Sequence, residues 1–211
     1  MRDIFGRSWA GRRVTVVGLR KSGSAAIELL NRAGCRVCAT ELRDAPELRS
    51  IRDTLMEHGA EEIEIGRHTP RLIERAELVV VSPGVPESAG PLEWAVVRGL
   101  PIISEIELAF HFSPSPMVAV TGTNGKSTAV TLIAALLQAG GREAVACGNL
   151  GLPFSSVVPQ LTPRTTVVVE ASSFQLLRCD QFRPRIGVLL NIGTNHLDRH
   201  PDRAHYIAAK A

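Results

Sequence analysis

The sequence predicts an α/β protein built from two doubly wound parallel-sheet domains. Apolar runs of strand length alternate with amphipathic segments of helix length along the chain, which is typical of parallel sheets covered by helices. The tetrapeptide Ser113–Pro116 interrupts this alternation near mid-chain, where its two prolines fix φ and remove two backbone donors. A length of 211 residues is sufficient for two ordinary domains.

The first domain is expected over residues 1–112, as a compact Rossmann-like unit. Its apolar runs predict strands at Arg13–Val17, Arg36–Ala39, Glu62–Ile65, Leu78–Ser82 and Pro101–Ile103. The segments between and after them predict helices at Ser24–Ala33, Leu48–His58, Pro91–Arg98 and Ser104–Phe112.

The second domain is expected over residues 113–211. Strands are predicted at Met117–Thr121, Ala144–Ala146, Thr166–Glu170 and Ile186–Asn191, with a helix at Ser127–Gln138. This is a second α/β unit with fewer elements than the first, so we expect an incomplete domain.

Composition excludes several classes of partner. The apolar fraction of 45% and the charged fraction of 21% are those of a soluble globular protein. A formal net charge of +3, from scattered basic residues, gives no basis for binding nucleic acid or an anionic membrane. No apolar stretch is long enough to span a membrane, and residues 1–7 lack the apolar core of a secretory signal. We therefore expect a cytoplasmic protein.

The four cysteines include a C-x-x-C pair, Cys35 and Cys38, whose spacing is also that of a metal or redox site. Val37 lies between them in a run typical of a buried strand. The pattern therefore favours ordinary buried thiols over a metal site.

A glycine-containing loop that binds phosphate is predicted between the first strand and the first helix of the second domain. It comprises Gly122, Thr123, Asn124, Gly125, Lys126, Ser127 and Thr128. The unpaired N–H groups of a helix N-terminus suit the phosphates of ATP, the Lys126 ammonium suits their β and γ oxygens, and the Ser127 hydroxyl suits Mg²⁺. The loop is a shorter variant, G-x-x-G-K-S, of the common pattern, and the alternative is a chance turn at a helix start.

Polar side chains follow the next strands of the same predicted sheet. Glu170 ends an apolar strand, where a carboxylate beside the phosphate loop suits Mg²⁺, although it could also be an acid at a helix start. Asn191 and His196 follow another strand and should reach the same edge, because ligands bind beyond the carboxyl ends of parallel strands.

The first domain carries a second, weaker nucleotide signal. The segment Gly18–Gly23 follows the first strand and resembles a dinucleotide fingerprint, but Arg20 replaces the second glycine and so disfavours NAD binding. Ser22 could still hold a phosphate at the helix start. Glu41 could meet a ribose or base, and Ser82 ends another strand at this edge.

Several ordered segments together resemble the Mur ligase family, over essentially the whole chain. They are Gly122–Thr128 (GTNGKST), Gly148–Pro153 (GNLGLP), Glu170–Leu176 (EASSFQL), Asn191–His200 (NIGTNHLDRH), Ser82–Val85 (SPGV) and Ser104–Leu108 (SEIEL). The EASSFQL, SPGV and SEIEL segments are most similar to the D-glutamate-adding member. The resemblance implies a UDP-substrate-binding Rossmann-like domain followed by a P-loop ATPase-type central domain.

The resemblance implies an ATP-dependent ligase that joins D-glutamate to UDP-N-acetylmuramoyl-L-alanine through an acyl phosphate. It gives catalytic roles to Lys126, His196 and Lys210, the last as a carbamylated lysine. Ser127, Glu170 and His196 would hold Mg²⁺. Ser22, Glu41 and Ser82 would lie around the UDP, while Asn149 and Ser172 would contact the rest of the substrate. The alternative for Lys210 is a surface lysine on the last helix.

The family pattern continues for roughly as long again, into a C-terminal ligase domain. We therefore expect these 211 residues to have no turnover of their own, and we expect a monomer. Two other readings stay open: a non-catalytic UDP-nucleotide-binding module, and an oxidoreductase, against which Arg20 is the discriminating residue.

Overall fold

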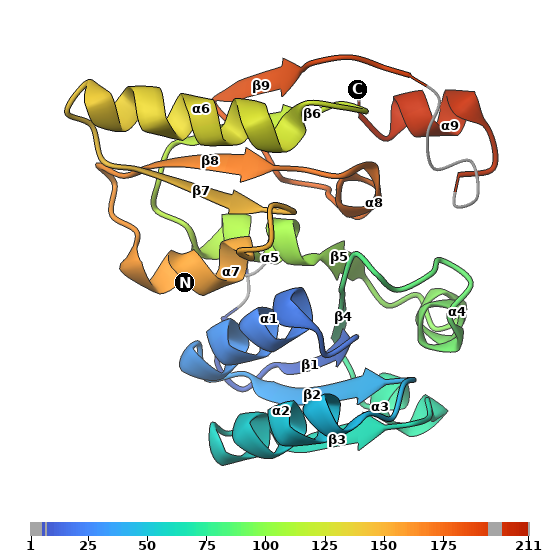
Figure 1. Cartoon of the computed structure of the whole chain (residues 1–211). Coiled ribbons are helices and arrows are strands. Elements are labelled where there is room, and N and C mark those ends of the chain that lie inside the picture. Colours follow the sequence, from blue (N-terminus) through green and yellow to red (C-terminus); the bar gives the residue numbers. More distant parts are fainter. Residues whose placement is uncertain (1–5, 7, 194–199, 211) are drawn as a thin grey trace.

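The computed structural model describes residue 6, residues 8–193 and residues 200–210, and it contains two parallel β-sheets (Figure 1). The first sheet has the strand order β3-β2-β1-β4-β5, and all its neighbours pair in parallel. Its strands are β1 (Arg13–Val17), β2 (Arg36–Glu41), β3 (Glu62–Ile65), β4 (Leu78–Val81) and β5 (Ile102–Ser104). The predicted doubly wound unit is confirmed.

Five helices accompany this sheet. They are α1 (Lys21–Arg32), α2 (Pro46–Glu57), α3 (Pro70–Glu74), α4 (Gly90–Val97) and α5 (Glu105–Phe112). Proline in the first turn of α2, α3 and α4 suits a helix start, because its missing N–H would have no intrahelical partner there. Helix α1 begins at Lys21 rather than at the predicted Ser24, because Gly18, with φ 93°, completes the turn from β1 earlier.

The second sheet has the order β7-β8-β6-β9, again all parallel. Its elements are β6 (Met117–Thr121), α6 (Lys126–Ala139), β7 (Ala144–Gly148), α7 (Phe154–Val157), η1 (Val158–Gln160), β8 (Thr166–Glu170), α8 (Ser173–Leu176), β9 (Ile186–Leu189) and α9 (Arg203–Ala208). Strand β9 ends two residues before the predicted limit, Asn191, where the chain turns toward the loop after β6. Ser113–Pro116 lies between α5 and β6, outside every element.

Helix α5 joins the two sheets. Ser104 caps it by accepting a hydrogen bond from the N–H of Glu107. The buried Glu107 carboxylate in turn accepts hydrogen bonds from the N–H groups of Gln181 and Phe182, both at 2.8 Å, in the segment before β9. One hydrophobic core therefore continues from the first sheet through α1 and α5 to α7 and β8.

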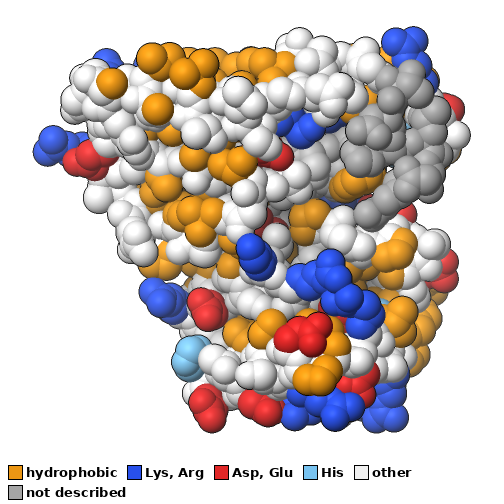
Figure 2. Space-filling model, in the orientation of Figure 1, with side chains coloured by type: hydrophobic (Ala, Val, Ile, Leu, Met, Phe, Trp, Pro, Cys, Tyr) orange, Lys and Arg blue, Asp and Glu red, His pale blue; other side chains and the backbone are white. Residues whose placement is uncertain are grey.

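The outer face of α6 is apolar. Leu132 and Leu136 are 55% and 63% exposed, and Figure 2 shows hydrophobic side chains gathered along the top of the molecule over this helix. Ile186 and Leu189 of β9 are also exposed. Exposed apolar patches of this kind are typical of surfaces that other polypeptide covers. In the part of the chain described here, no helix combines the length and apolarity needed to cross a membrane.

The cysteines are free thiols with little reactivity. Cys35 is buried and Cys38 is half-buried on β2. Burial raises the pKa of Cys35 to about 11, and burial also raises the pKa of Cys38. No group of three or more His, Cys, Asp and Glu side chains able to hold a metal gathers within residues 8–193 and 200–210.

Candidate phosphate- and nucleotide-binding site

The loop between β6 and α6 depends on its glycines. Gly122 has φ 149°, and a Cβ there would lie 3.2 Å from Leu190 Cβ. Gly125 has φ 82° and forms the N-cap of α6. The first-turn N–H groups of α6, at Lys126, Ser127 and Thr128, find no acceptor among the described residues. The loop thus offers unpaired donors at a helix start, which fits a phosphate group.

Two lysines lie against this loop. Lys126 Nζ donates to the carbonyl oxygens of Gly122 and Thr123, both at 2.9 Å. Lys210, which is 8% exposed, donates through Nζ to Thr121 Oγ1 at 3.0 Å and to Gly122 O at 3.2 Å. Burial, and then the charge of Lys126, lower the pKa of Lys210 to about 8. The alternative of a surface lysine is therefore wrong.

Glu170 lies beside the loop at the end of β8, which pairs with β6 on one side and β7 on the other. Its Oε2 accepts a hydrogen bond from Ser127 Oγ at 2.7 Å, and its Oε1 accepts one from Asn149 Nδ2 at 3.0 Å. Gly148, opposite Glu170 in the ladder, has φ 95°, and a Cβ there would lie 2.3 Å from Glu170 O. The hydroxyl and carboxylate oxygens are hard donors that fit Mg²⁺.

Thr123 and Asn124 are held from the end of β9. Asn191 Oδ1 accepts hydrogen bonds from the N–H groups of Thr123 at 3.2 Å and Asn124 at 3.0 Å. The Thr123 hydroxyl contacts Tyr206 Oη at 2.9 Å and accepts from the N–H of Gly193 at 2.8 Å. Asn191 reaches the predicted edge, whereas His196 lies outside the described residues.

Ser172 is the N-cap of the short helix α8. Its hydroxyl accepts from the N–H of Gln175, whose side-chain oxygen accepts from the N–H of Ser172, so the two form a capping box. The next residue, Ser173, is buried and contacts His200 Nε2 through Oγ at 2.9 Å. Ser172 therefore follows β8, the strand that pairs with β6, and its hydroxyl caps helix α8.

The candidate residues of the first unit also lie together, at the carboxyl edge of its sheet. Ser82 Oγ donates to Gly18 O at 3.1 Å, and Glu41 accepts from the N–H of Leu19 at 3.1 Å. Ser22 lies in the first turn of α1. The next residue is Gly23, where an added Cβ would lie 1.8 Å from Gly18 O. This edge is the switch point between β1 and β4, where open parallel sheets bind ligands.

The carboxyl edge of the first sheet lies next to the carboxyl edge of the second sheet. Lys21, at the start of α1, donates through Nζ to the carbonyl of Gly151, which follows β7, at 3.4 Å. The two candidate half-sites therefore lie side by side.

Two contacts of the site were not predicted, those of Tyr206 and of Thr121. Tyr206 is the single tyrosine of the chain and stands four residues before Lys210, a spacing that places both on one side of a helical turn. Its ring lies 4.9 Å from Lys210 Nζ. The four-residue spacing could have indicated that Tyr206 and Lys210 lie close together. The contact of Thr121 with Lys210 could not be predicted, because it depends on the path of the chain after β9.

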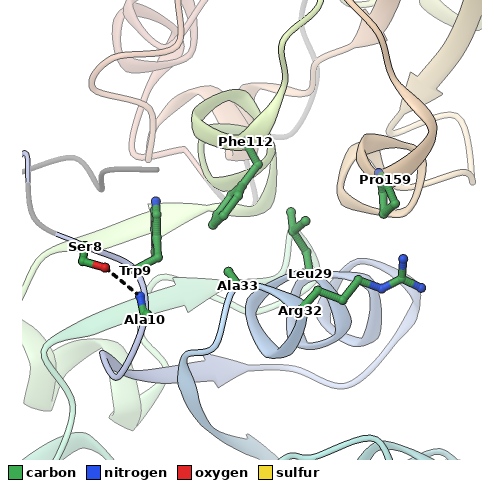
Figure 3. A pocket seen from close by; sticks show the side chains of 8 residues that line it. All are labelled: Ser8, Trp9, Ala10, Leu29, Arg32, Ala33, Phe112 and Pro159. Atoms are coloured by element: carbon green, nitrogen blue, oxygen red, sulfur yellow. Dashed lines mark hydrogen bonds between the residues drawn. The ribbon is translucent and has the colours of Figure 1, made fainter.

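A cavity of about 360 Å³ lies elsewhere, between α1 and α5 (Figure 3). It is lined by Ser8, Trp9, Ala10, Leu29, Arg32, Ala33, Phe112 and Pro159. The Trp9 and Phe112 rings pack with their centroids 4.8 Å apart. None of the candidate site residues lines it, so this cavity is separate from the site.

Comparison with known proteins matches both units. Residues 12–104 match the Mur ligase MurD-like N-terminal domain, and residues 120–211 match the Mur ligase middle domain. A UDP-N-acetylmuramoylalanine–D-glutamate ligase of Koribacter versatilis is 42% identical over 200 residues, which cover 95% of this chain and 44% of that protein. The same-named protein of Citrifermentans bemidjiense is 43% identical over 201 residues, which cover 94% and 44%.

Solved structures with little sequence identity share the fold. The Neisseria meningitides UDP-N-acetylmuramate:L-alanyl-gamma-D-glutamyl-meso-diaminopimelate ligase matches with a TM-score of 0.57 and 20% identity, over 95% of this chain and 66% of that one. A murein peptide ligase of Psychrobacter arcticus matches with a TM-score of 0.54 and 18% identity, over 89% and 44%. Both unit-specific matches and the fold lead to one conclusion: the chain belongs to the Mur ligase family.

Proposed function

We propose that this chain provides the substrate- and ATP-binding parts of a ligase that adds D-glutamate to UDP-N-acetylmuramoyl-L-alanine during peptidoglycan precursor synthesis. The chain spans about 44% of the length of the curated relatives it matches. The observation that carries the proposal is the meeting of Lys126 with the Ser127–Glu170 pair at one sheet edge, in a chain similar to ligases of that name.

Residues 113–211 form the ATP-binding half in this proposal. The N–H groups at the start of α6 bind phosphate oxygens, and Lys126 leaves the carbonyls of Gly122 and Thr123 to neutralise charge on the transferring group. Ser127 and Glu170 hold Mg²⁺, which stabilises phosphate charge when bound, and His196 serves a second ion. The hydrogen bond from Ser127 Oγ to Glu170 Oε2 supports this role, because it holds the two oxygens next to each other.

Residues 1–112 form the half that binds the UDP-substrate, with Ser22, Glu41 and Ser82 around the nucleotide. Their place at the switch point of the first sheet supports this role. Asn149 and Ser172 contact the muramoyl-alanine part between the two edges. The substrate carboxylate is activated as an acyl phosphate, which the amine of D-glutamate then displaces.

Lys210 acts as a carbamate in this proposal. Carbamylation consumes a neutral amine, and a pKa of about 8 leaves a substantial neutral fraction near physiological pH. The carbamate would replace a cation beside Lys126 with an anion, and so remove the repulsion between the two ammonium groups.

Calorimetric titration of the chain with ATP and Mg²⁺ tests the proposal. We expect Lys126→Ala to weaken ATP binding at least about tenfold, the loss of one charge-assisted contact. We expect Glu170→Gln to remove most of the Mg²⁺ dependence, and Lys21→Ala to leave ATP binding unchanged. Equal affinities for the wild type and Lys126→Ala would overturn the ATP-binding role. Binding of UDP-N-acetylmuramoyl-L-alanine without ATP binding would favour a non-catalytic module.

A further inference from the structure

Asn191 is attached to the phosphate loop more extensively than its place after β9 requires. The ladder between β6 and β9 continues one residue beyond the strands, where the N–H of Leu190 donates to Thr121 O at 3.0 Å. This register brings Asn191 beside the rising part of the loop. Its main-chain oxygen accepts from the N–H of Thr123 at 3.1 Å.

The carboxamide of Asn191 pairs with the backbone of the loop through both its atoms. Oδ1 accepts from the N–H groups of Thr123 at 3.2 Å and Asn124 at 3.0 Å. Nδ2 donates to Asn124 O at 3.0 Å. Both backbone polar groups of Asn124 are thus satisfied by one side chain. A carboxylate could accept from the N–H groups but could not donate to the carbonyl, so the pairing is specific to an amide.

The loop needs such support because two of its residues adopt backbone conformations that favour glycine. Gly122 and Gly125 have φ values of 149° and 82°, and glycine loses more conformational freedom on ordering than any other residue. The Asn191 contacts lie between these two glycines, at Thr123 and Asn124. They therefore hold the two residues that separate the glycines.

We infer that Asn191 is a positioning residue for phosphate binding, because its carboxamide holds the N–H groups of Thr123 and Asn124 and leaves those of Gly125 and the first turn of α6 to the phosphate. The inference rests on the proposed ATP-binding function. It assigns the anion-binding donors of this loop to its second half, and it predicts that the first half stays bonded to Asn191 when a polyphosphate binds.

Amide hydrogen exchange, measured by NMR on the chain without ligand, tests the holding contact. We expect Asn191→Ala to speed exchange at Asn124 at least about tenfold, as loss of its hydrogen bond implies. Exchange at Thr123 should change less, because its N–H keeps the main-chain oxygen of residue 191 as an acceptor. Asn191→Asp keeps the acceptor but sets a second oxygen against Asn124 O, so it should retain only part of the protection. Gln138→Ala removes a carboxamide that donates to Ala144 O at the other end of α6, and it should leave both rates unchanged. Unchanged exchange of the β4 amide of Val80 would show that the fold is intact.

Calorimetry with tripolyphosphate tests the consequence for binding, since this probe carries neither base nor ribose. We expect Asn191→Ala to weaken tripolyphosphate binding about tenfold, with adenosine binding unchanged, because the lost restraint concerns the phosphate loop alone. Unaltered tripolyphosphate affinity, or unaltered exchange at Asn124, would overturn the inference. A wild-type chain that does not bind tripolyphosphate would instead overturn the proposed ATP site, while the exchange measurement would still decide whether Asn191 holds the loop.

Discussion

The ammonium groups of Lys126 and Lys210 share one acceptor, the carbonyl oxygen of Gly122, at 2.9 Å and 3.2 Å. The two residues come from the start of α6 and the turn after α9, and they meet only because the chain returns to the loop. The charge of Lys126 adds to burial in lowering the pKa of Lys210. The repulsion therefore favours the neutral amine of Lys210, which is the form that carbamylation consumes.

Replacement of Lys126 by methionine should raise the pKa of Lys210 toward the usual 10.5. Burial is the larger cause of the lowered pKa and stays in place, so the rise should be partial. The chain has lysines only at 21, 126 and 210, so ¹³C-methylated lysine signals can be followed individually during a pH titration. Lys21→Met is the matched control and should leave the Lys210 titration unchanged. A Lys210 pKa that does not move in Lys126→Met would contradict the coupling.

Because the carboxyl group of Glu105 is buried, we expect the free energy of unfolding to fall as the pH rises. It is 1% exposed, its Oε1 accepts from the N–H of Ser155, and its Oε2 has no partner among the described residues. Burial raises its pKa from 4.5 to about 7, although hydrogen bonds from Ser155 oppose the rise. Between these values the folded chain binds more protons than the unfolded chain, so the free energy of unfolding decreases with pH.

Glu105→Gln should therefore be more stable than the wild type at pH 8, by up to about 3 kcal/mol, and should lose this advantage near pH 4.5. Urea denaturation at a series of pH values measures the difference. A difference that does not depend on pH would show that Glu105 is not held protonated.

Glu107, two residues along α5, predicts the opposite dependence. Burial alone would raise its pKa, but hydrogen bonds from His111 and from the N–H groups of Gln181 and Phe182 lower it overall. A lowered pKa in the folded chain gives stability that is present above the unfolded pKa and is lost as the pH falls. Glu107→Gln should lose about 2 kcal/mol at pH 7, as for a buried charged hydrogen bond. The difference in unfolding free energy from the wild type should shrink below pH 4.5, and the same urea series measures it. A difference that is the same at every pH would show that the charge of Glu107 does not matter.

The sequence predicted both sheets because most of their strands are apolar runs, and several of these are followed by a helix-length amphipathic segment. It also predicted the edge at which Glu170 and Asn191 arrive, since the carboxyl ends of parallel strands meet. Short helices such as α7 and α8 were not predicted, because four residues show no helical period. The contacts of Lys210 and Tyr206 depend on the path of the chain after β9, which no local pattern encodes.

Gly148 should tolerate no side chain, because its neighbour in the ladder is the backbone of Glu170. An added Cβ would lie 2.3 Å from Glu170 O, and φ is 95°. Gly148→Ala should therefore lower the free energy of unfolding by more than about 3 kcal/mol, and the strand carrying Glu170 should shift. Gly151→Ala is the matched control, since its φ is 100° but no atom lies within 4 Å of its Cβ.

Gly151→Ala should lower the free energy of unfolding only by the cost of a positive φ at alanine, about 1 kcal/mol. Urea denaturation gives both values, and the difference between them isolates the clash with Glu170. If the alanine at 148 costs no more than the alanine at 151, β8 can move away from β7 without loss. In that case Glu170 would not be fixed beside Ser127 by the β7–β8 ladder, and the Mg²⁺ dependence of ATP binding should survive in Gly148→Ala.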